Sequence, residues 1–185
     1  GFVWMHINKG NKDSTVYVKS ARVEKATIPL VEPYELAYKT LRQFDGLLLY
    51  ISLANGQECV GEVIPLEGYT EETLEGVYSK VKSWIPDLKG LPLCLLRDKI
   101  SKETKEFPCA SSLILSALDN VFFVTSNQNQ RQVPLVYPVS SITSDLYGAV
   151  QRALGEGFRT IKVKIGQNFS KDIKALDDFK AVKTE

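Results

Sequence analysis

The sequence predicts an α+β domain followed by two parallel βα units. In the first half, Asn55-Gly56 stands between two apolar runs, a strong hairpin signal. Helical runs with apolar residues three and four positions apart follow this hairpin. After a polar stretch at 126–132, strand, helix, strand and helix alternate with short connections, which is typical of a parallel sheet.

The first half is expected to contain a three-stranded antiparallel meander. Val16–Ile28 alternates weakly between apolar and polar residues, and Pro29 is expected to stop this first strand. Pro33-Tyr34-Glu35 should begin a connection or a short helix. Asp45–Ala54 and Gln57–Ile64 are the second and third strands, and the Asn-Gly pair between them suits a two-residue type I′ turn.

Helices should follow the meander. Thr70 is the expected N-cap of the first, with Glu71 and Glu72 in its first turn and Pro86 at its end. Leu88–Ile100 is ambiguous, and a loop with a short helix is expected there. Pro108 begins a helix with a broad apolar face made of Ala110, Leu113, Ile114, Ala117, Leu118 and Val121.

The second half is expected to consist of two βα units. Val133–Val139 is the first strand, and Ser144 caps a helix that Gly157 closes. The second strand, Thr160–Ile165, leads to a last helix capped by Ser170. Because the chain shows only two such parallel strands, the outer edge of the second strand would lack a partner, which predicts a homo-oligomer.

Two lysines lie on one face of that second strand. With a period of two, Ile161, Val163 and Ile165 share one face while Lys162 and Lys164 share the other. Lysines on a solvated or edge face suppress unwanted strand pairing. In the interior of a closed parallel barrel, however, an ammonium group is costly unless it is paired or used. Both explanations are open at this point.

The composition is that of an ordinary soluble globular protein. The chain has 185 residues, of which 44% are hydrophobic and 24% charged, enough to bury a core. A formal charge of +1 gives no reason to expect nucleic acid or a membrane surface as a partner. Residues 1–15, which hold the single histidine, His6, lack the apolar core of a signal peptide and suit a tag or loose terminus. Three widely spaced cysteines suit reduced thiols in a cytoplasmic protein.

Four segments in this order carry a resemblance to a known family: Gly61-Glu62 with Pro65, the run from Gly68 to Thr73, Pro108 to Ser112 with Ala117-Leu118-Asp119, and Gly157 to Gly166. From about Val16 onward, the chain resembles the enolase superfamily in its muconate-lactonizing and mandelate-racemase branch. The resemblance implies that residues 16–126 form the N-terminal capping domain and 127–185 an incomplete (β/α) barrel, the first two βα units of a TIM barrel. The chain therefore looks truncated.

The resemblance also implies a reaction and a set of site residues. Members remove a proton α to a carboxylate and stabilise the enediolate on a divalent metal, usually Mg²⁺. Muconate cycloisomerase, dipeptide epimerase and o-succinylbenzoate synthase are the expected types of isomerase or lyase, each acting on a small carboxylate. By similarity, Lys164 is a general base or acid, and Lys162 lies beside it and touches the substrate carboxylate. Two loops of the capping domain would shape specificity through Leu30, Val31, Tyr34, Gly61 and Glu62.

Two departures from the family bear on activity. The family's metal ligands are acids at the ends of the third, fourth and fifth barrel strands, and the acids that follow Lys164 here, Asp172, Asp177, Asp178 and Glu185, lie on the last helix or the tail. Residues 126–130 also replace a glycine-rich join. We therefore expect no metal ligands in this chain and no activity of the chain alone. A non-catalytic binding or assembly protein, and a small α/β protein with solvated lysines, are the alternatives.

Overall fold

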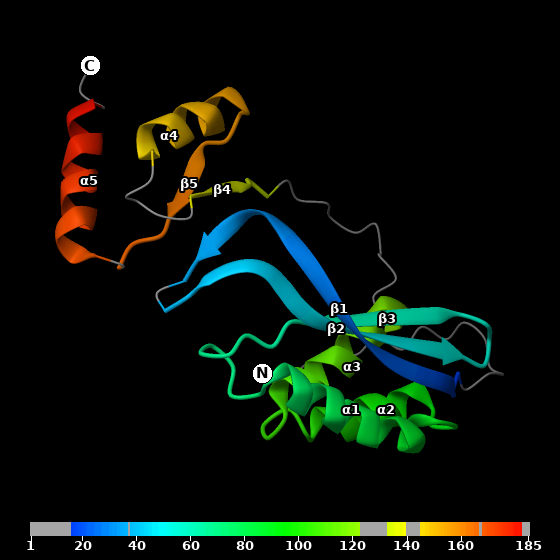
Figure 1. Cartoon of the computed structure of the whole chain (residues 1–185). Helices are drawn as coiled ribbons and strands as arrows, with labels where there is room; N and C mark the ends of the chain where they lie inside the picture. The colour runs from blue at the N-terminus through cyan, green and yellow to red at the C-terminus, as the bar shows by residue number, and fades with distance from the viewer. Residues whose placement is uncertain (1–15, 37, 123–132, 140–144, 167, 183–185) are drawn as a thin grey trace. The chain divides into compact units, whose positions relative to one another are not determined.

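The computed structural model describes residues 16–36, 38–122, 133–139, 145–166 and 168–182 (Figure 1). The chain divides into two compact units. The first comprises Gly1–Ile28 and Asp45–Ser126, and the second comprises Pro29–Phe44 and Asn127–Glu185. The expected loose terminus at 1–15 with His6, the polar stretch at 126–132 and the expected cap Ser144 lie outside the described residues.

The predicted antiparallel meander is confirmed. Its strands have the order β1-β2-β3 and the bounds Val18–Glu35, Thr40–Leu53 and Glu58–Val63. In the pairing of β2 with β3, Leu47 lies opposite Val63 and Ser52 opposite Glu58. Pro29 does not stop β1, which also includes Pro33, so both expectations for this stretch were wrong. β1 is an edge strand, where one row of N–H groups faces no other strand and proline is tolerated.

The turn between β2 and β3 is longer than predicted. The Leu53 carbonyl accepts from the Gly56 N–H at 3.0 Å, and the Leu53 N–H donates to the Gln57 carbonyl at 2.8 Å. Residues 54–56 therefore form the loop, and the expected two-residue type I′ turn was wrong. Gly56 has a φ of 86°, a conformation that favours glycine. The Asn55 side chain accepts from the Gln57 N–H at 3.0 Å and supports the turn.

Three helices of the first unit lie on one face of its sheet (Figure 1), namely α1 (Leu74–Leu88), α2 (Leu93–Ser101) and α3 (Pro108–Phe122). The N-cap of α1 is Thr73, whose hydroxyl accepts from the Gly76 N–H at 3.1 Å, so the expected cap at Thr70 was wrong. Pro86 lies inside α1 instead of ending it. The ambiguous stretch contains α2, and α3 begins at Pro108 as predicted, where a missing N–H costs nothing.

The core of the first unit lies between the sheet and these helices. Alternate residues of β2 are almost completely buried, and they meet apolar side chains of all three helices, among them Val77, Val81, Leu96, Leu113 and Leu118. Burial of a Leu or Val side chain contributes roughly 1.5–3 kcal/mol. This layer of leucine and valine residues is therefore the main source of stability in the first unit.

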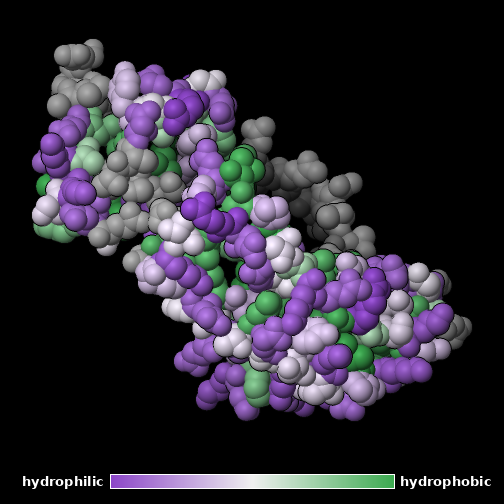
Figure 2. Space-filling view, viewed as in Figure 1, coloured by the Kyte–Doolittle hydropathy of each residue, from purple (hydrophilic) through white to green (hydrophobic). Residues whose placement is uncertain are grey.

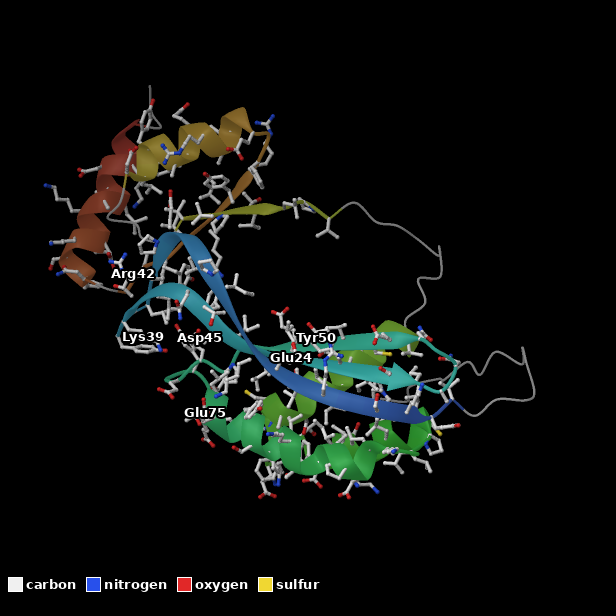
Figure 3. The ribbon with its side chains drawn as sticks, turned by 45° about the vertical axis from the view of Figure 1, so that its right-hand side comes forward. Glu24, Lys39, Arg42, Asp45, Tyr50 and Glu75 are labelled. Atoms are coloured by element: carbon white, nitrogen blue, oxygen red, sulfur yellow. The ribbon has the colours of Figure 1, made fainter. Side chains whose placement is uncertain are left out.

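The opposite face of this sheet carries polar and aromatic side chains. The Arg22 guanidinium lies 3.9 Å from the centre of the Tyr50 ring and also pairs with Glu24 at 2.9 Å (Figure 3). Hydrophilic side chains predominate on the side of the molecule shown in Figure 2. None of the helices in the described ranges is both long enough and apolar enough to cross a membrane.

The second unit contains the predicted βα units. They are β4 (Val136–Val139), α4 (Leu146–Gly155), β5 (Thr160–Val163) and α5 (Phe169–Val182), and β4 pairs with β5 in parallel. Asp145 caps α4 by accepting from the Gly148 N–H at 2.9 Å. Gly157 follows α4 with a φ of 88°. Ser170 lies inside α5 and the helix begins beside Asn168, which accepts from the Lys171 N–H at 3.1 Å, so the cap predicted there was wrong.

The core of the second unit is small. Its buried cluster consists of Val139, Leu146 and Ala149, against which half-buried side chains of β5 and α5 pack. The helices α4 and α5 cover only one face of the two parallel strands. The described residues form no closed barrel. The predicted fold class, a capping domain followed by an incomplete barrel, is confirmed.

Candidate functional site

The strand β5 presents two different faces. Ile161 and Val163 pack on the buried cluster beneath α4 and α5. Lys162 is exposed and Lys164 half-buried on the other face, as the period of two predicts. Strand pairing continues past β5, because the Lys164 N–H donates to the Val139 carbonyl at 3.2 Å. Lys164 thus stands at the carboxyl end of a parallel strand, where α/β folds bind their ligands.

Tyr34 is the expected specificity residue that the structure brings to Lys164. Both residues belong to the second unit, and the Lys164 ammonium nitrogen lies 5.1 Å from the centre of the Tyr34 ring. This separation is within the range of cation–π attraction. Leu30 and Val31 precede Tyr34 on the same strand, and the side chain of Val31 is fully exposed.

Gly61 and Glu62 belong to the first unit, on β3. Gly61 is buried, and a methyl group there would come within 2.0 Å of the Leu113 carbonyl oxygen on α3. The Glu62 N–H donates to the Ser116 hydroxyl at 3.2 Å, and that hydroxyl donates to the Leu113 carbonyl at 3.1 Å. Gly61 therefore has a packing role in the structure, while the side chain of Glu62 is exposed.

Asp172 is a residue whose role the sequence did not suggest. The chain turns at Gly166, with a φ of 100°, two residues after Lys164. The Gly166 N–H donates at 2.7 Å to the carboxylate of Asp172, in the first turn of α5. Only 5% of Asp172 is exposed. In the sequence, Asp172 stands out only as an acid shortly after the Lys-x-Lys strand, in a position that does not suit a metal ligand.

The Mg²⁺ that the resemblance implies needs oxygen ligands converging on one point. Within the described ranges, no three side chains of His, Cys, Asp or Glu gather in this way. A pocket of about 310 Å³ in the second unit is also separate from the lysines, since its lining is Glu32, Tyr137, Pro138, Val139, Asp145, Ala149 and Arg152.

Comparison with known proteins gives relatives of one kind. No family model matches the chain. The o-succinylbenzoate synthase of Proteus mirabilis (strain HI4320) is 26% identical over 149 residues, which cover 80% of this chain and 42% of that protein. The L-Lys-D/L-Arg epimerase of Desulforapulum autotrophicum is 24% identical over 177 residues, covering 86% of this chain and 49% of that protein. The chain thus spans about half the length of the curated relatives it matches.

Solved structures agree with these relatives. A dipeptide epimerase from Methylococcus capsulatus, complexed with Mg and L-Arg-D-Lys, superposes with a TM-score of 0.73 at 21% identity, over 88% of this chain and 49% of that one. A mandelate racemase/muconate lactonizing protein from Herpetosiphon aurantiacus gives 0.74 at 17% identity, over 90% and 51%. An enolase superfamily member from Roseovarius nubinhibens ISM gives 0.66 at 19% identity, over 88% and 49%.

The fold defines the class of protein first: an α+β capping domain joined to the opening βα units of a parallel barrel, with a lysine pair on the second strand. The neighbours then confirm the resemblance predicted from the sequence. The chain has the fold of the first half of an enolase-superfamily subunit of the muconate-lactonizing and mandelate-racemase branch.

Proposed function

We propose that this chain supplies the lysine pair of an isomerase or lyase that moves a proton on the carbon α to a carboxylate. The observation that carries the proposal is the position of Lys164, at the carboxyl end of β5 with the Tyr34 ring 5.1 Å from its ammonium nitrogen. The similarity to an L-Lys-D/L-Arg epimerase and to a dipeptide epimerase supports amino-acid-derived carboxylates as the substrate class. Muconate cycloisomerase and o-succinylbenzoate synthase types stay within the proposal.

Lys164 acts in this proposal as the base. In its unprotonated form the Lys164 side chain takes the α proton, so a C–H bond breaks and an N–H bond forms while the electron pair moves into the carboxylate as an enediolate. Lys162 stands two residues before it on the same face and attracts the substrate carboxylate by its charge. Tyr34, with Leu30 and Val31 before it on the same strand, borders the lysine and limits the side chains that fit.

The described residues supply no ligand set for Mg²⁺, so none of these steps is assigned to a metal. For the same reason, we propose that the chain alone does not turn over substrate. The proposal places the protein in the cytoplasm, with a small carboxylate as its partner, as a homo-oligomer, and without nucleic acid or membrane partners.

Exchange of the α proton tests the role of Lys164. L,L-dipeptides and N-succinyl amino acids are incubated with Mg²⁺ in D₂O, and NMR follows deuterium at the α carbon. The assay uses the 185-residue chain and the polypeptide that its native gene encodes. We expect exchange in the latter and at least a 10³-fold loss in Lys164→Met, since general-base catalysis is worth 10²–10⁴-fold. Exchange that survives this substitution would contradict the proposal.

A non-catalytic binding or assembly protein is the second candidate. It is favoured by the exposed apolar side chains beside the β5 edge, with Ile165 at 60% and Phe169 at 80% exposure. Such surface in a monomer often marks an interaction site. The same assay separates the two functions, because a natively folded gene product that exchanges no α proton of any substrate in the panel would support this alternative.

A further inference from the structure

Lys164 is followed directly by a sharp turn of the chain. Val139 holds Lys164 on the β4 side through the 3.2 Å backbone hydrogen bond. After Lys164, Ile165 is 60% exposed and Gly166 adopts a φ of 100°. Only Ile165 separates Lys164 from Gly166, so the backbone conformation at Gly166 affects the direction in which the chain leaves the strand at Lys164.

The carboxylate of Asp172 fixes that turn. Its Oδ2 accepts the Gly166 N–H at 2.7 Å, and its own N–H donates to the Asn168 carbonyl at 2.8 Å as part of α5. A charge-assisted bond of this length to a 5%-exposed carboxylate is among the stronger hydrogen bonds in proteins. The position in the first turn of α5 also favours a negative charge. Asp172 therefore joins the rigid helix to the end of the lysine strand.

We infer that Asp172 is a positioning residue for Lys164. By accepting the hydrogen bond from the Gly166 N–H, it holds the end of the strand so that the Lys164 ammonium stays beside the Tyr34 ring. This inference rests on the proposed function for its purpose, although not for its geometry. The competing account is purely structural, in which Asp172 only stabilises the start of α5.

The chain offers a matched control for that competing account. Asn168 also stabilises the start of α5, through its 3.1 Å bond from the Lys171 N–H, but it makes no bond to Gly166 in the structure. Asn168→Ala should lower the denaturation midpoint of the protein, as the loss of a helix cap does. It should leave the hydrogen bond between the Gly166 N–H and the Asp172 carboxylate intact. Asp172→Asn keeps an oxygen acceptor for the Gly166 N–H and removes the charge.

The readout is the NMR signal of Lys164 in the full chain carrying ¹³Cε-labelled lysine. Lys164→Arg assigns the signal, and Tyr34→Leu measures the part of its shift that the aromatic ring causes. We expect Asp172→Ala to remove more than half of this ring-dependent shift. Asp172→Asn should retain most of it, and Asn168→Ala should leave it unchanged.

A second variant guards against misfolding of Asp172→Ala. No atoms lie within 4 Å of a methyl group placed on Gly166, so Gly166→Ala disturbs only the backbone conformation of the turn, and it should reduce the ring-dependent shift as well. An unchanged Lys164 signal in both variants, or an equal loss in Asn168→Ala, would overturn the inference. The measurement needs no turnover, so a failure of the exchange assay would leave this result standing, and the reverse also holds.

Discussion

The side chain of Glu72 joins two parts of the first unit that lie far apart in the sequence. Its carboxylate accepts hydrogen bonds from the backbone N–H groups of Cys109 and Ala110 at the start of α3, and Cys109 lies 37 residues away in the sequence. Burial raises the pKa of the Cys109 thiol to about 11, and the charge of Glu72 with its hydrogen bond adds to this effect. The thiol is therefore neutral in the folded protein at any physiological pH.

The raised pKa of Cys109 predicts an alkaline loss of stability. In the unfolded chain the Cys109 thiol ionises near its ordinary pKa of 9.0. The stability that the raised pKa contributes to the folded state is therefore complete below pH 9 and is lost as the pH rises through about 11. The unfolding free energy of the wild type minus that of Cys109→Ala should fall by about 2 kcal/mol between pH 8 and pH 10.5. Urea denaturation at both pH values measures the difference. The same comparison with Cys94→Ala, an exposed cysteine, should show no such fall.

Residue roles were predictable from the sequence only where the partner is local. Thr70 and Glu72 were placed at the start of the same helix because their spacing fits a capped first turn. The true cap is Thr73, which left Glu72 free to cap α3 instead. Asp172 was missed for a related reason: nothing in its spacing shows that it is buried against Gly166. The face of β5 on which Lys162 and Lys164 lie was predicted correctly, because strand alternation alone determines it.

At Gly61, strand β3 approaches α3 so closely that only glycine fits. A methyl group on Gly61 would lie 2.0 Å from the Leu113 carbonyl, a backbone atom that cannot move aside without shifting α3. We expect Gly61→Ala to lower the unfolding free energy by about 3 kcal/mol, at the upper end of the range for overpacked cores. Denaturant titration of the purified variant measures this.

Gly155→Ala is the matched control for Gly61→Ala. Gly155 ends α4 and has no atoms within 4 Å of a methyl group placed on it. The substitution should be neutral or stabilising by up to about 1 kcal/mol. Equal effects at the two positions would show that the close approach of β3 to α3 does not exist in solution.

The types of the elements were predicted better than their ends. Apolar spacing correctly indicated α1, α3 and the parallel strands, because burial of one face enforces that spacing, whereas the stretch that contains α2 was ambiguous. Pro29 misled the prediction because its cost depends on whether β1 is a central or an edge strand, which its sequence does not show. Asn55-Gly56 likewise located the hairpin, although the length of its turn follows from the register of the β2–β3 pairing.

The two units differ in the size of their cores. The first buries apolar side chains from a sheet and three helices, whereas the buried cluster of the second consists of Val139, Leu146 and Ala149. We expect amide hydrogen exchange in β2 and α3 to be at least tenfold slower than in β4 and α4, after correction for intrinsic rates. Mass spectrometry of peptides from the labelled chain measures both. Equal protection would show that the units open together.

The second unit is built from two segments, 29–44 and 127–185, that stand on either side of residues 45–126. During synthesis, the segment that carries Tyr34 is made first, and strands β4 and β5 of the same unit follow roughly 90 residues later. At 5–20 residues per second this is a delay of about 5–20 s. In that time the first unit can complete its helices and the core between them and its sheet. The surroundings of Lys164 are therefore assembled last, on a chain whose first half is already folded.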